Sequence, residues 1–417
     1  MLSIALFFIA CEHNIDDPKN PLEPAPEPFE CEELSRPEIS DADILAAAQA
    51  DTLFAMDIKE AVQEENSNLF ISPFSITSAL GLLHLGANGI SDQEMQSTLY
   101  MSDAESWHAG KGLLTQELHQ PERCDYQLAI ANRVFGQSGY SILDDYLGAT
   151  ESIYGAPLQE VDFASDPEAG RQVVNQWVSD QTMTHIPELF PVGSISGNTK
   201  LVLANAVYMN APWKHTFDPD NTRPMPFTTE SGELIETDMM YDGAMPVRSY
   251  QDDLLTMATF SYEGDELSMT VYVPQEGHSL IELEETLGAE EIAELQGRQS
   301  RGEKMVYFPK FELKSKLMLN EPLIKLGMAS LFDPETSDLS GINGIGGLYV
   351  STVIHEAWLK VDEAGTKAAA ATGISVEDTA MDVDYIINLN RAFMFTIQDE
   401  LSGNILFMGR VADPSQE

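Results

Sequence analysis

The sequence has few basic residues. Its 417 residues include 22 Lys and Arg against 68 Asp and Glu, so the formal net charge is −46. Residues 1–50 contribute only −9 of that charge, and the acidity therefore belongs mainly to the rest of the chain. Such a surface repels nucleic acids and heparin-like polyanions, which argues against both as partners. Life in high salt, solubility or attraction of a cationic partner would each account for the acidity, and solvation is the simplest of the three.

Cysteine is also scarce, with three in the chain. The sequence has no Cys-x-x-Cys pair, no His-Glu-x-x-His and no phosphate-binding Gly-rich loop; His355 and Glu356 begin a zinc-protease motif that lacks its second His. We therefore expect neither a metal nor a cofactor. Cys31 and Cys124 could form a disulfide in an exported protein, and the sequence leaves this open.

The nucleophile motif of the serine hydrolases is missing as well. Those enzymes carry Gly-x-Ser-x-Gly at a strand-to-helix turn, whereas residues 193–197 (GSISG) have Ile195 at the centre. The carboxylates are too numerous to single out an acid–base pair. The sequence predicts that the protein is not an enzyme.

The N-terminus lacks an apolar run long enough to span a bilayer. Residues 2–10 are apolar but short, and with Cys11 they resemble a bacterial lipoprotein cleavage site without its usual basic start. Residues 1–10 are thus predicted to be a signal peptide and Cys11 to be lipidated. Residues 11–40 are acidic and rich in proline, which predicts a stiff extended tether. A disordered tail without a function would have the same composition. The protein would be secreted or lipid-anchored at a cell envelope, outside the cytoplasm, with its folded body at residues 41–417.

What the sequence does have is a run of small residues at 363–372 (EAGTKAAAAT). Alanine favours helix, yet after Gly365 the pattern has the period of a strand. Small or apolar side chains would share one face, and charged ones the other. The inward face would carry Thr366, Ala368, Ala370, Thr372, Ile374 and Val376. A strand of this kind fits into a sheet with one face buried, whereas a short helix or a flexible linker is the alternative.

Several sequence blocks, in order from about residue 51 to 414, resemble the serpin family of protease inhibitors. The run at 363–372 resembles the family's reactive-loop hinge, with Lys367 where an acidic residue is usual. The other blocks are 68–76 (NLFISPFSI), 203–208 (LANAVY) with Trp213, 217–222 (FDPDNT), 308–311 (FPKF), 326–328 (LGM) with Leu331 and Phe332, and 406–411 (LFMGRV).

Two blocks depart from the family's pattern. Ala392 stands where the family normally has proline, and Thr184 and His185 replace a usual Gly-Lys. Neither change touches the hinge.

The resemblance implies an α+β fold. It predicts a serpin-like single domain with three β-sheets, eight or nine helices and an exposed reactive-centre loop at about 363–388. From periodicity alone, residues 42–65 are predicted to form a helix and residues 267–273 a strand that ends at Pro274.

The resemblance also implies the function. The loop would be bait for a serine protease, and after cleavage the hinge would insert into the main sheet and trap the acyl-enzyme; loop insertion in serpins is a known example of strand addition. The partner would be an endopeptidase bound covalently, with cysteine proteases left open, and the protein is expected to be a monomer. The alternative is a non-inhibitory serpin that acts as a binding or structural protein. The small hinge residues favour inhibition; they are Glu363, Gly365, Thr366, Ala368, Ala369, Ala370, Ala371 and Thr372.

The bond to be cleaved depends on which end of the loop is counted from. The family's spacing after Glu363 gives Thr379–Ala380, whereas counting back from residues 390–391 gives Met381–Asp382. We prefer the first, because cleavage at Met381 would leave the carboxylate of Asp378 on the buried face. These residues suit elastase-, chymotrypsin- or subtilisin-like enzymes better than trypsin.

Five further residues are implied by resemblance to control the insertion. Ser72, Ser75, Asn205 and His355 would lie at the shutter, where the sheet opens, and Trp213 at the breach, where the loop enters. Taken alone, each of the four polar residues would be interpreted as a buried polar group with its hydrogen bonds satisfied, and Trp213 as a core residue.

Overall fold

The computed structural model describes residues 42–118, 126–139, 141–366 and 386–416. The predicted signal peptide and tether lie outside the described residues, as do Cys11, Cys31 and Cys124. The described residues contain ten α-helices, nine of them six residues or longer. The helices are α1 (Ala42–Val62), α2 (Pro73–His84), α3 (Gly89–Thr98), α4 (Ala104–Leu118), α5 (Asp144–Tyr154), α6 (Pro167–Gln181), α7 (Leu280–Thr286), α8 (Ala289–Arg298), α9 (Asn320–Lys325) and α10 (Ser340–Asn343).

The strands of the described residues fall into two hydrogen-bonded sheets. They are β1 (Leu69–Ile71), β2 (Gln127–Gln137), β3 (Gln159–Val161), β4 (Leu201–Pro212), β5 (Arg223–Thr228), β6 (Leu234–Gln251), β7 (Leu255–Ser261), β8 (Leu267–Pro274), β9 (Ser300–Pro309), β10 (Phe311–Met318), β11 (Val350–Val361), β12 (Gly365–Thr366), β13 (Ile386–Asn388), β14 (Phe393–Asp399) and β15 (Ile405–Val411).

The sheet that matters for function has the order β10-β11-β4-β2-β3, and β12 pairs with β4. β10 pairs with β11, and β2 with β4, in antiparallel fashion. Between them, β11 and β4 run parallel, from Val350 beside Leu201 to Trp358 beside Tyr208. We call this parallel junction the seam. Every residue of β4 is buried or nearly so, as expected for a central strand covered on both faces.

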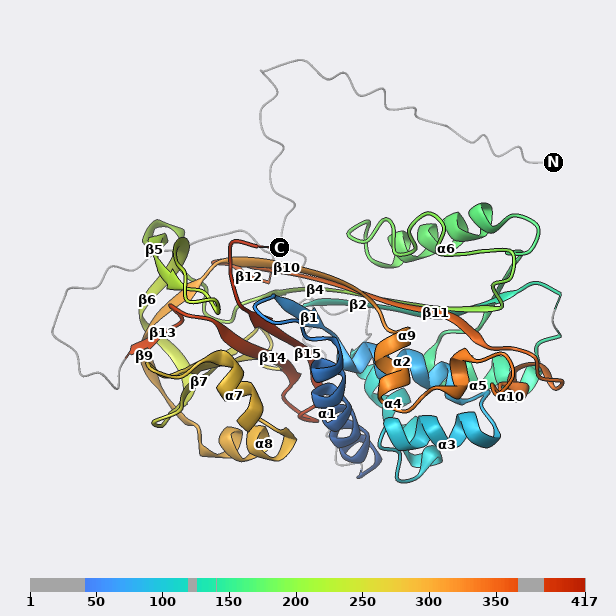
Figure 1. Ribbon diagram of the computed structural model, residues 1–417. Coiled ribbons are helices and arrows are strands. Elements are labelled where there is room, and N and C mark those ends of the chain that lie inside the picture. The colour runs from blue at the N-terminus through green and yellow to red at the C-terminus, as the bar shows by residue number, and fades with distance from the viewer. Residues whose placement is uncertain (1–41, 119–125, 140, 367–385, 417) are drawn as a thin grey trace, which may run out of the picture. The chain divides into compact units, whose positions relative to one another are not determined.

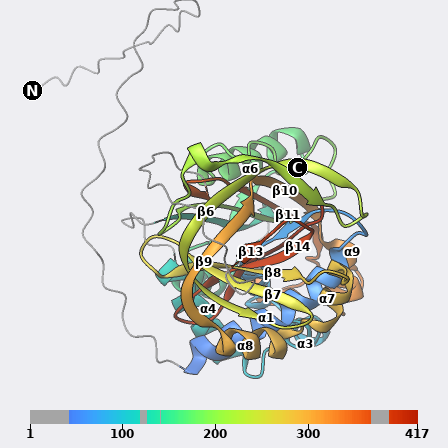
Figure 2. The same ribbon diagram turned by 90° about the vertical axis from the view of Figure 1, so that its left-hand side faces the viewer.

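The other sheet has nine strands in the order β1-β15-β14-β8-β7-β6-β9-β13, with β5 also on β6. In Figure 2, β6 and β9 run side by side. The long strand β6 pairs with β5 in its first half and with β7 in its second. Two of the three sheets expected from the sequence are therefore joined through β6, whose pairing with β9 shifts register between Asp242 and Met245.

Helices cover both faces of the six-stranded sheet. Figure 1 shows α6 on one face, with α2, α4 and α5 on the other. Apolar side chains of α6 and the segment after it pack on β2 and β4, and a separate apolar core fills the space between α1, α2, α4, α5 and the sheet. The result is the α+β fold that the sequence predicts, with two of its three expected sheets joined through β6.

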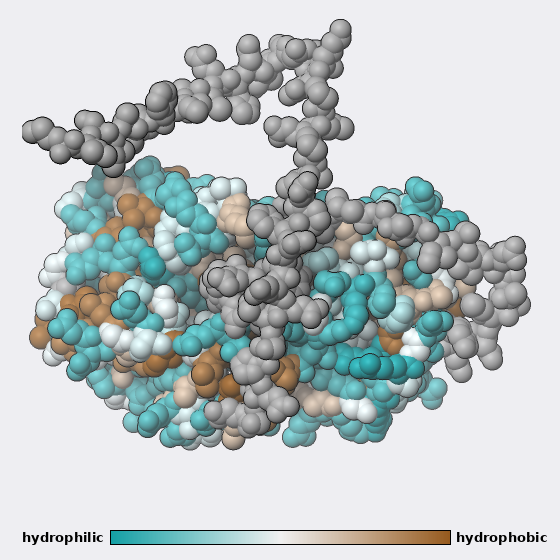
Figure 3. All heavy atoms as spheres, turned by 180° about the vertical axis from the view of Figure 1, so that it is seen from behind, coloured by the Kyte–Doolittle hydropathy of each residue, from teal (hydrophilic) through white to brown (hydrophobic). Residues whose placement is uncertain are grey.

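Local signals in the sequence explain where elements begin and end. The predicted helix at 42–65 is α1 (Ala42–Val62), and the predicted strand at 267–273 is β8, which includes Pro274 as its last residue. Helix α2 starts at Pro73 because Ser72 caps it, with its hydroxyl accepting the Ser75 N–H. None of the helices in the described part of the chain is both long and apolar enough to cross a membrane. On the face seen in Figure 3, hydrophilic residues predominate and the apolar ones form separate patches.

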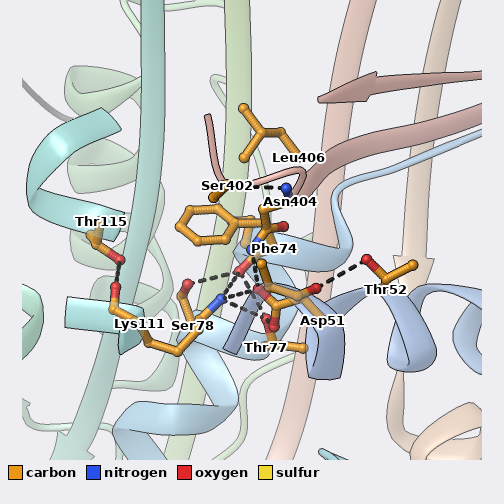
Figure 4. Close-up of polar contacts among 12 residues, drawn as sticks. Asp51, Thr52, Phe74, Thr77, Ser78, Lys111, Thr115, Ser402, Asn404 and Leu406 are labelled. Carbon is orange, nitrogen blue, oxygen red and sulfur yellow. Dashed lines mark hydrogen bonds and ion pairs between the residues drawn. The ribbon is translucent and has the colours of Figure 1, made fainter. Parts of the chain in front are cut away.

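A buried ion pair ties α1, α2 and α4 together (Figure 4). Lys111 of α4 lies 2.7 Å from the Asp51 carboxylate of α1, and both side chains are fully buried. Thr77 of α2 and Asn404 of the β14–β15 turn donate hydrogen bonds to the same carboxylate, each at 2.7 Å. The Lys111 ammonium also lies 3.8 Å from the ring centre of Phe74. Burial lowers the pKa of Lys111 to about 8, and Asp51 opposes that shift.

Removing one partner of this pair is expected to be costly. Lys111→Ala leaves Asp51 charged and buried without its cation, so the free energy of unfolding should fall by about 3–5 kcal/mol. Equilibrium denaturation in urea measures this. The matched control is Lys214→Ala, because Lys214 pairs with Asp265 while its side chain is 40% exposed; that change should cost under about 1 kcal/mol. Equal losses for the two variants would refute the prediction.

Candidate functional site

The candidate site is the end of the seam at Tyr208 and Trp358, together with the segment that follows β11. After β11 the chain turns back between Asp362 and Gly365, which exchange backbone hydrogen bonds of 3.0 and 3.2 Å. Gly365 and Thr366 then form β12, antiparallel to β4, opposite Pro212 and Ala211. The first two residues of an additional strand are therefore already paired with β4 beyond the point where β11 and β4 separate.

Gly365 is required at this turn by its surroundings. Its φ is +141°, which L side chains rarely adopt, and a Cβ would lie only 2.4 Å from the Ala211 carbonyl oxygen. The close approach lets β12 pair directly with β4. No other residue type fits here without moving the backbone.

Trp213 holds the turn in place. Its backbone N–H donates to the carbonyl of Ala364 at 2.9 Å, and its indole N–H donates to the carbonyl of Asp362 at 3.1 Å. The indole ring stacks on Tyr262 at a centroid distance of 4.6 Å. Tyr262 in turn lies 3.0 Å from the hydroxyl of the fully buried Thr366. Trp213 is therefore a buried core residue that also contacts the turn before β12.

Glu363 anchors the turn by its side chain. Its carboxylate accepts hydrogen bonds from Lys310 at 2.8 Å and from Thr222 at 2.7 Å. Burial alone would raise the pKa of Glu363, but these two donors outweigh it and hold the pKa below its ordinary value. The neighbouring Asp362 has a raised pKa, chiefly because it is partly buried. The hinge thus begins at a charged, hydrogen-bonded anchor.

The other predicted residues, Ser72, Ser75, Asn205 and His355, lie together on the α2 face of the seam. His355 of β11 and Asn205 of β4 are register partners, and the His355 Nδ1 contacts the Asn205 side-chain oxygen. The Ser72 N–H donates to His355 Nε2 at 3.1 Å, and Asn205 Nδ2 lies 2.7 Å from the Ser75 hydroxyl. This network, which we call the polar clasp, joins the two strands that would have to separate.

The partners of His355 fix its protonation. Because Nε2 accepts from Ser72, the ring proton sits on Nδ1 and is donated to Asn205. Complete burial lowers the pKa of His355 to about 3, so the ring is neutral over the ordinary pH range. A second proton on Nε2 would face the Ser72 N–H. The polar clasp therefore needs a neutral histidine.

On the opposite, α6 face of the seam three rings form a second contact. Tyr208 of β4 and Trp358 of β11 are register partners, with ring centroids 5.7 Å apart. His185, in the segment after α6, stacks on Tyr208 at 4.3 Å and on Trp358 at 5.0 Å. We call this the aromatic clasp. A strand inserted between β4 and β11 would have to separate both clasps.

Sequence reasoning missed several of these residues. Asn132 of β2 completes the polar clasp, donating to the Ser75 carbonyl at 3.1 Å; only the β2–β4 register reveals it. Tyr262, just after β7, and Lys310, between β9 and β10, also contact the hinge. Lys310 stood in a matched block, but its partner was not apparent from the sequence. His185 was noted as a departure from the family pattern, but a departure alone does not show a contact.

Some predicted residues have no structural description. Ala368 to Thr372 and both candidate bonds, at Thr379–Ala380 and Met381–Asp382, lie outside the described residues. In the part that is described, no group of three or more His, Cys, Asp or Glu side chains could hold a metal ion.

Comparison with known proteins gives concordant findings. A family model described as Serpin (serine protease inhibitor) matches residues 49–414. Leukocyte elastase inhibitors of the horse, Equus caballus, and of cattle, Bos taurus, are 35% and 36% identical to this chain, each match covering 88% of this chain and 98% of the relative. The solved structure of human thyroxine-binding globulin resembles this one with a TM-score of 0.81 at 25% identity, covering 90% of this chain and 100% of that one.

The aromatic clasp predicts a faster opening of the seam when His185 is removed. Stacked ring pairs contribute about 0.5–1.5 kcal/mol each, so His185→Ala should speed annealing of a synthetic peptide of residues 366–378 to the protein about two- to tenfold. Fluorescence of a labelled peptide gives the rate. His278→Ala, on an exposed histidine away from the seam, is the control. An unchanged rate in His185→Ala would show that the clasp does not limit opening.

The lowered pKa of His355 predicts acid sensitivity. The folded state binds this proton less readily than the unfolded chain, so its contribution is complete above about pH 6.5 and falls as the pH drops toward 3. In His355→Gln the slope of unfolding free energy against pH should decrease by about 1.4 kcal/mol per pH unit over that range. Denaturant titrations at several pH values measure it. An unchanged slope in His355→Gln would count against the assignment.

Proposed function

Because this chain belongs to the serpin (serine protease inhibitor) family, we propose that it is an irreversible inhibitor of serine endopeptidases that works by inserting its own cleaved loop. The family is one of protease inhibitors and not of enzymes. The observation that carries the proposal is β12. Gly365 and Thr366 already occupy the start of the position that an inserted strand would take.

The proposed reaction begins with attack by the protease. Its serine hydroxyl adds to the carbonyl carbon of Thr379, the bond to the Ala380 nitrogen breaks, and that amine leaves with a proton, so that residue 379 becomes an ester of the enzyme. Loop residues beyond Thr366 then continue β12 down the seam. If the inserting loop distorts the active site of the protease before water attacks the ester, the ester is not hydrolysed and the complex stays covalent.

The small hinge residues support insertion. Thr366 is fully buried against Tyr262, and the residues after it alternate so that small side chains would follow on the same inward face. A large or charged residue on that face would have to be buried between strands. The hinge therefore matches an inserting strand better than a fixed exposed loop.

The expected target is an elastase-, chymotrypsin- or subtilisin-like protease. The relatives at 35% and 36% identity are named leukocyte elastase inhibitors. The loop has no Arg or Lys between Ala368 and Asn390, which disfavours trypsin. Cysteine endopeptidases with apolar preferences fall within the same proposal. A lipid on Cys11 and the segment 11–40 would place the inhibitor at a cell envelope.

A second function remains supported by one observation. The human thyroxine-binding globulin, whose fold this chain shares, is named for binding a small molecule. A non-inhibitory binding protein would let proteases cut the loop without forming a covalent complex. Trapping distinguishes the two functions.

The test mixes the purified full chain with elastase, chymotrypsin, subtilisin or trypsin and analyses the products on denaturing gels. We expect a band at the summed mass for at least one of the first three, none for trypsin, and a released fragment that begins at Ala380. A fragment that begins at Asp382 would move the bond to Met381. Clean cleavage by all four enzymes, with no rise in thermal stability afterwards, would refute inhibition and favour the binding protein.

One variant links this outcome to the hinge. Thr366→Arg must place a guanidinium where Thr366 packs against Tyr262, so insertion should slow and the molar ratio needed for full inhibition should rise about tenfold or more. Lys367→Arg is the matched control, since Lys367 is predicted to face outward. Undiminished complex formation in Thr366→Arg would contradict the proposed insertion.

A further inference from the structure

Four side chains from four helices contact one another in a row, and none of them belongs to the hinge or to either clasp. Tyr154 ends α5, His108 lies in α4, His84 ends α2, and Asp92 lies in the first turn of α3. The Tyr154 hydroxyl lies 2.7 Å from His108 Nδ1, and His108 Nε2 lies 2.9 Å from His84 Nδ1. His84 Nε2 lies 3.0 Å from a carboxylate oxygen of Asp92. We call this row the histidine network.

The carboxylate at one end sets the direction of the hydrogen bonds. A carboxylate only accepts, so His84 carries its proton on Nε2, facing Asp92, and its Nδ1 is an acceptor. His108 must then donate from Nε2 to His84, which leaves His108 Nδ1 to accept from the Tyr154 hydroxyl. Both rings are neutral in this arrangement, and one proton lies in each contact.

Tight packing leaves the tyrosine little freedom to find another partner. A Cβ on Gly81 of α2 would lie only 2.4 Å from the Tyr154 hydroxyl and 3.1 Å from the Trp107 ring. Glycine is unfavourable inside a helix, so α2 gives up helix stability at this position to accommodate the tyrosine. Among the described residues, His108 is the acceptor that the Tyr154 hydroxyl reaches.

In the described part of the chain, the charged groups that act on the network from the surrounding helices are Asp92, Lys111 and Asp51. Burial lowers the pKa of His84, and Asp92 opposes that shift. Burial, and after it the neighbouring His84 and Lys111, lower the pKa of His108 to about 3. Burial and Asp51 raise the pKa of Tyr154 well above its ordinary value, so Tyr154 remains a donor. A positive charge is therefore least unfavourable on His84, beside Asp92.

We propose that the histidine network is an acid-sensitive latch that holds the end of α5 against α4. When the pair gains one proton, it binds His108 Nδ1, and the hydrogen on His108 Nε2 moves to His84 Nδ1. His84 is then an imidazolium beside Asp92, and His108 is neutral again but with its hydrogen on the side of Tyr154. Two hydrogens now lie between His108 and Tyr154, the tyrosine has no acceptor, and a buried donor without an acceptor is unfavourable. Tyr154 therefore leaves, and α5 is released.

The latch is closed at neutral pH and opens in acid. The folded network binds a proton less readily than histidines in the unfolded chain, whose ordinary pKa is 6.5. Its contribution to stability is therefore complete above about pH 6.5 and falls as the pH decreases. The proposal concerns the free protein and does not rest on the proposed function.

Nuclear magnetic resonance of the full chain with ¹⁵N-labelled histidine tests the network without a variant. At about pH 7.5 we expect both His84 and His108 to carry hydrogen on Nε2 alone. At about pH 4.5 His84 should be doubly protonated and His108 should carry its hydrogen on Nδ1. Hydrogen on His108 Nδ1 at neutral pH, or titration of the two rings without any exchange of hydrogen between nitrogens, would overturn the proposal.

Hydrogen exchange of the full chain tests the release of α5. Between about pH 7.5 and about pH 4.5, protection in residues 150–156, corrected for the intrinsic effect of pH, should fall about tenfold. Peptides from β11 report on His355 separately, so opening of the polar clasp is not mistaken for opening of the latch. Unchanged protection in residues 150–156 would overturn the latch.

The variant His84→Gln assigns the effect. The amide oxygen of glutamine can still accept from His108, but the side chain cannot take up a proton. Protection in residues 150–156 should be retained at about pH 7.5, and the tenfold fall in acid should be lost. His278→Gln, on an exposed histidine beside Glu282, is the matched control and should behave as the wild type. A fall of the same size in His84→Gln would overturn the role of His84.

Discussion

The structure depends on one junction, the parallel pairing of β4 with β11. Both strands are buried on both faces, and their other neighbours in the sheet run antiparallel to them. One additional strand placed between two parallel strands can run antiparallel to both of them. The position of that strand is already marked at one end by β12. If a strand inserts there, as we propose, the seam must hold the sheet together and also be the place where the sheet parts.

Two contacts on opposite faces meet this double requirement. Asn205 and Tyr208 are three residues apart in β4, and their register partners His355 and Trp358 are three apart in β11, so one pair faces α2 and the other faces α6. The polar clasp uses hydrogen bonds whose donors and acceptors are all matched, while the aromatic clasp uses stacking. Neither is a salt bridge, so screening by salt would change neither contact much. A chain with a net charge of −46 thus has neutral groups at the junction where the proposed insertion would open the sheet.

The sequence predicted the fold, through two different kinds of signal. Periodicity identified α1 and β8, and the cap at Ser72 is a local pattern. The presence of three sheets was expected only from the family resemblance, and no strand order was predicted, because pairing between β4 and β11 joins residues about 150 apart. The same distance hid Asn132 and Tyr262, since no local feature of β2 or of the β7–β8 connection indicates a partner in another strand. His185 could not be interpreted from the sequence, as its stacking depends on where the chain lies after α6.

The short strand β12 also bears on how fast the sheet can change. Beginning a new strand inside a sheet normally requires loop closure and the loss of backbone entropy before any pairing offsets them. Here Gly365 and Thr366 have already met that cost, with Trp213 and Glu363 fixing the turn. Insertion would then be propagation from an existing nucleus, one residue after another like a zipper, and its rate would be set by the parting of β4 from β11 and not by the search for a starting register.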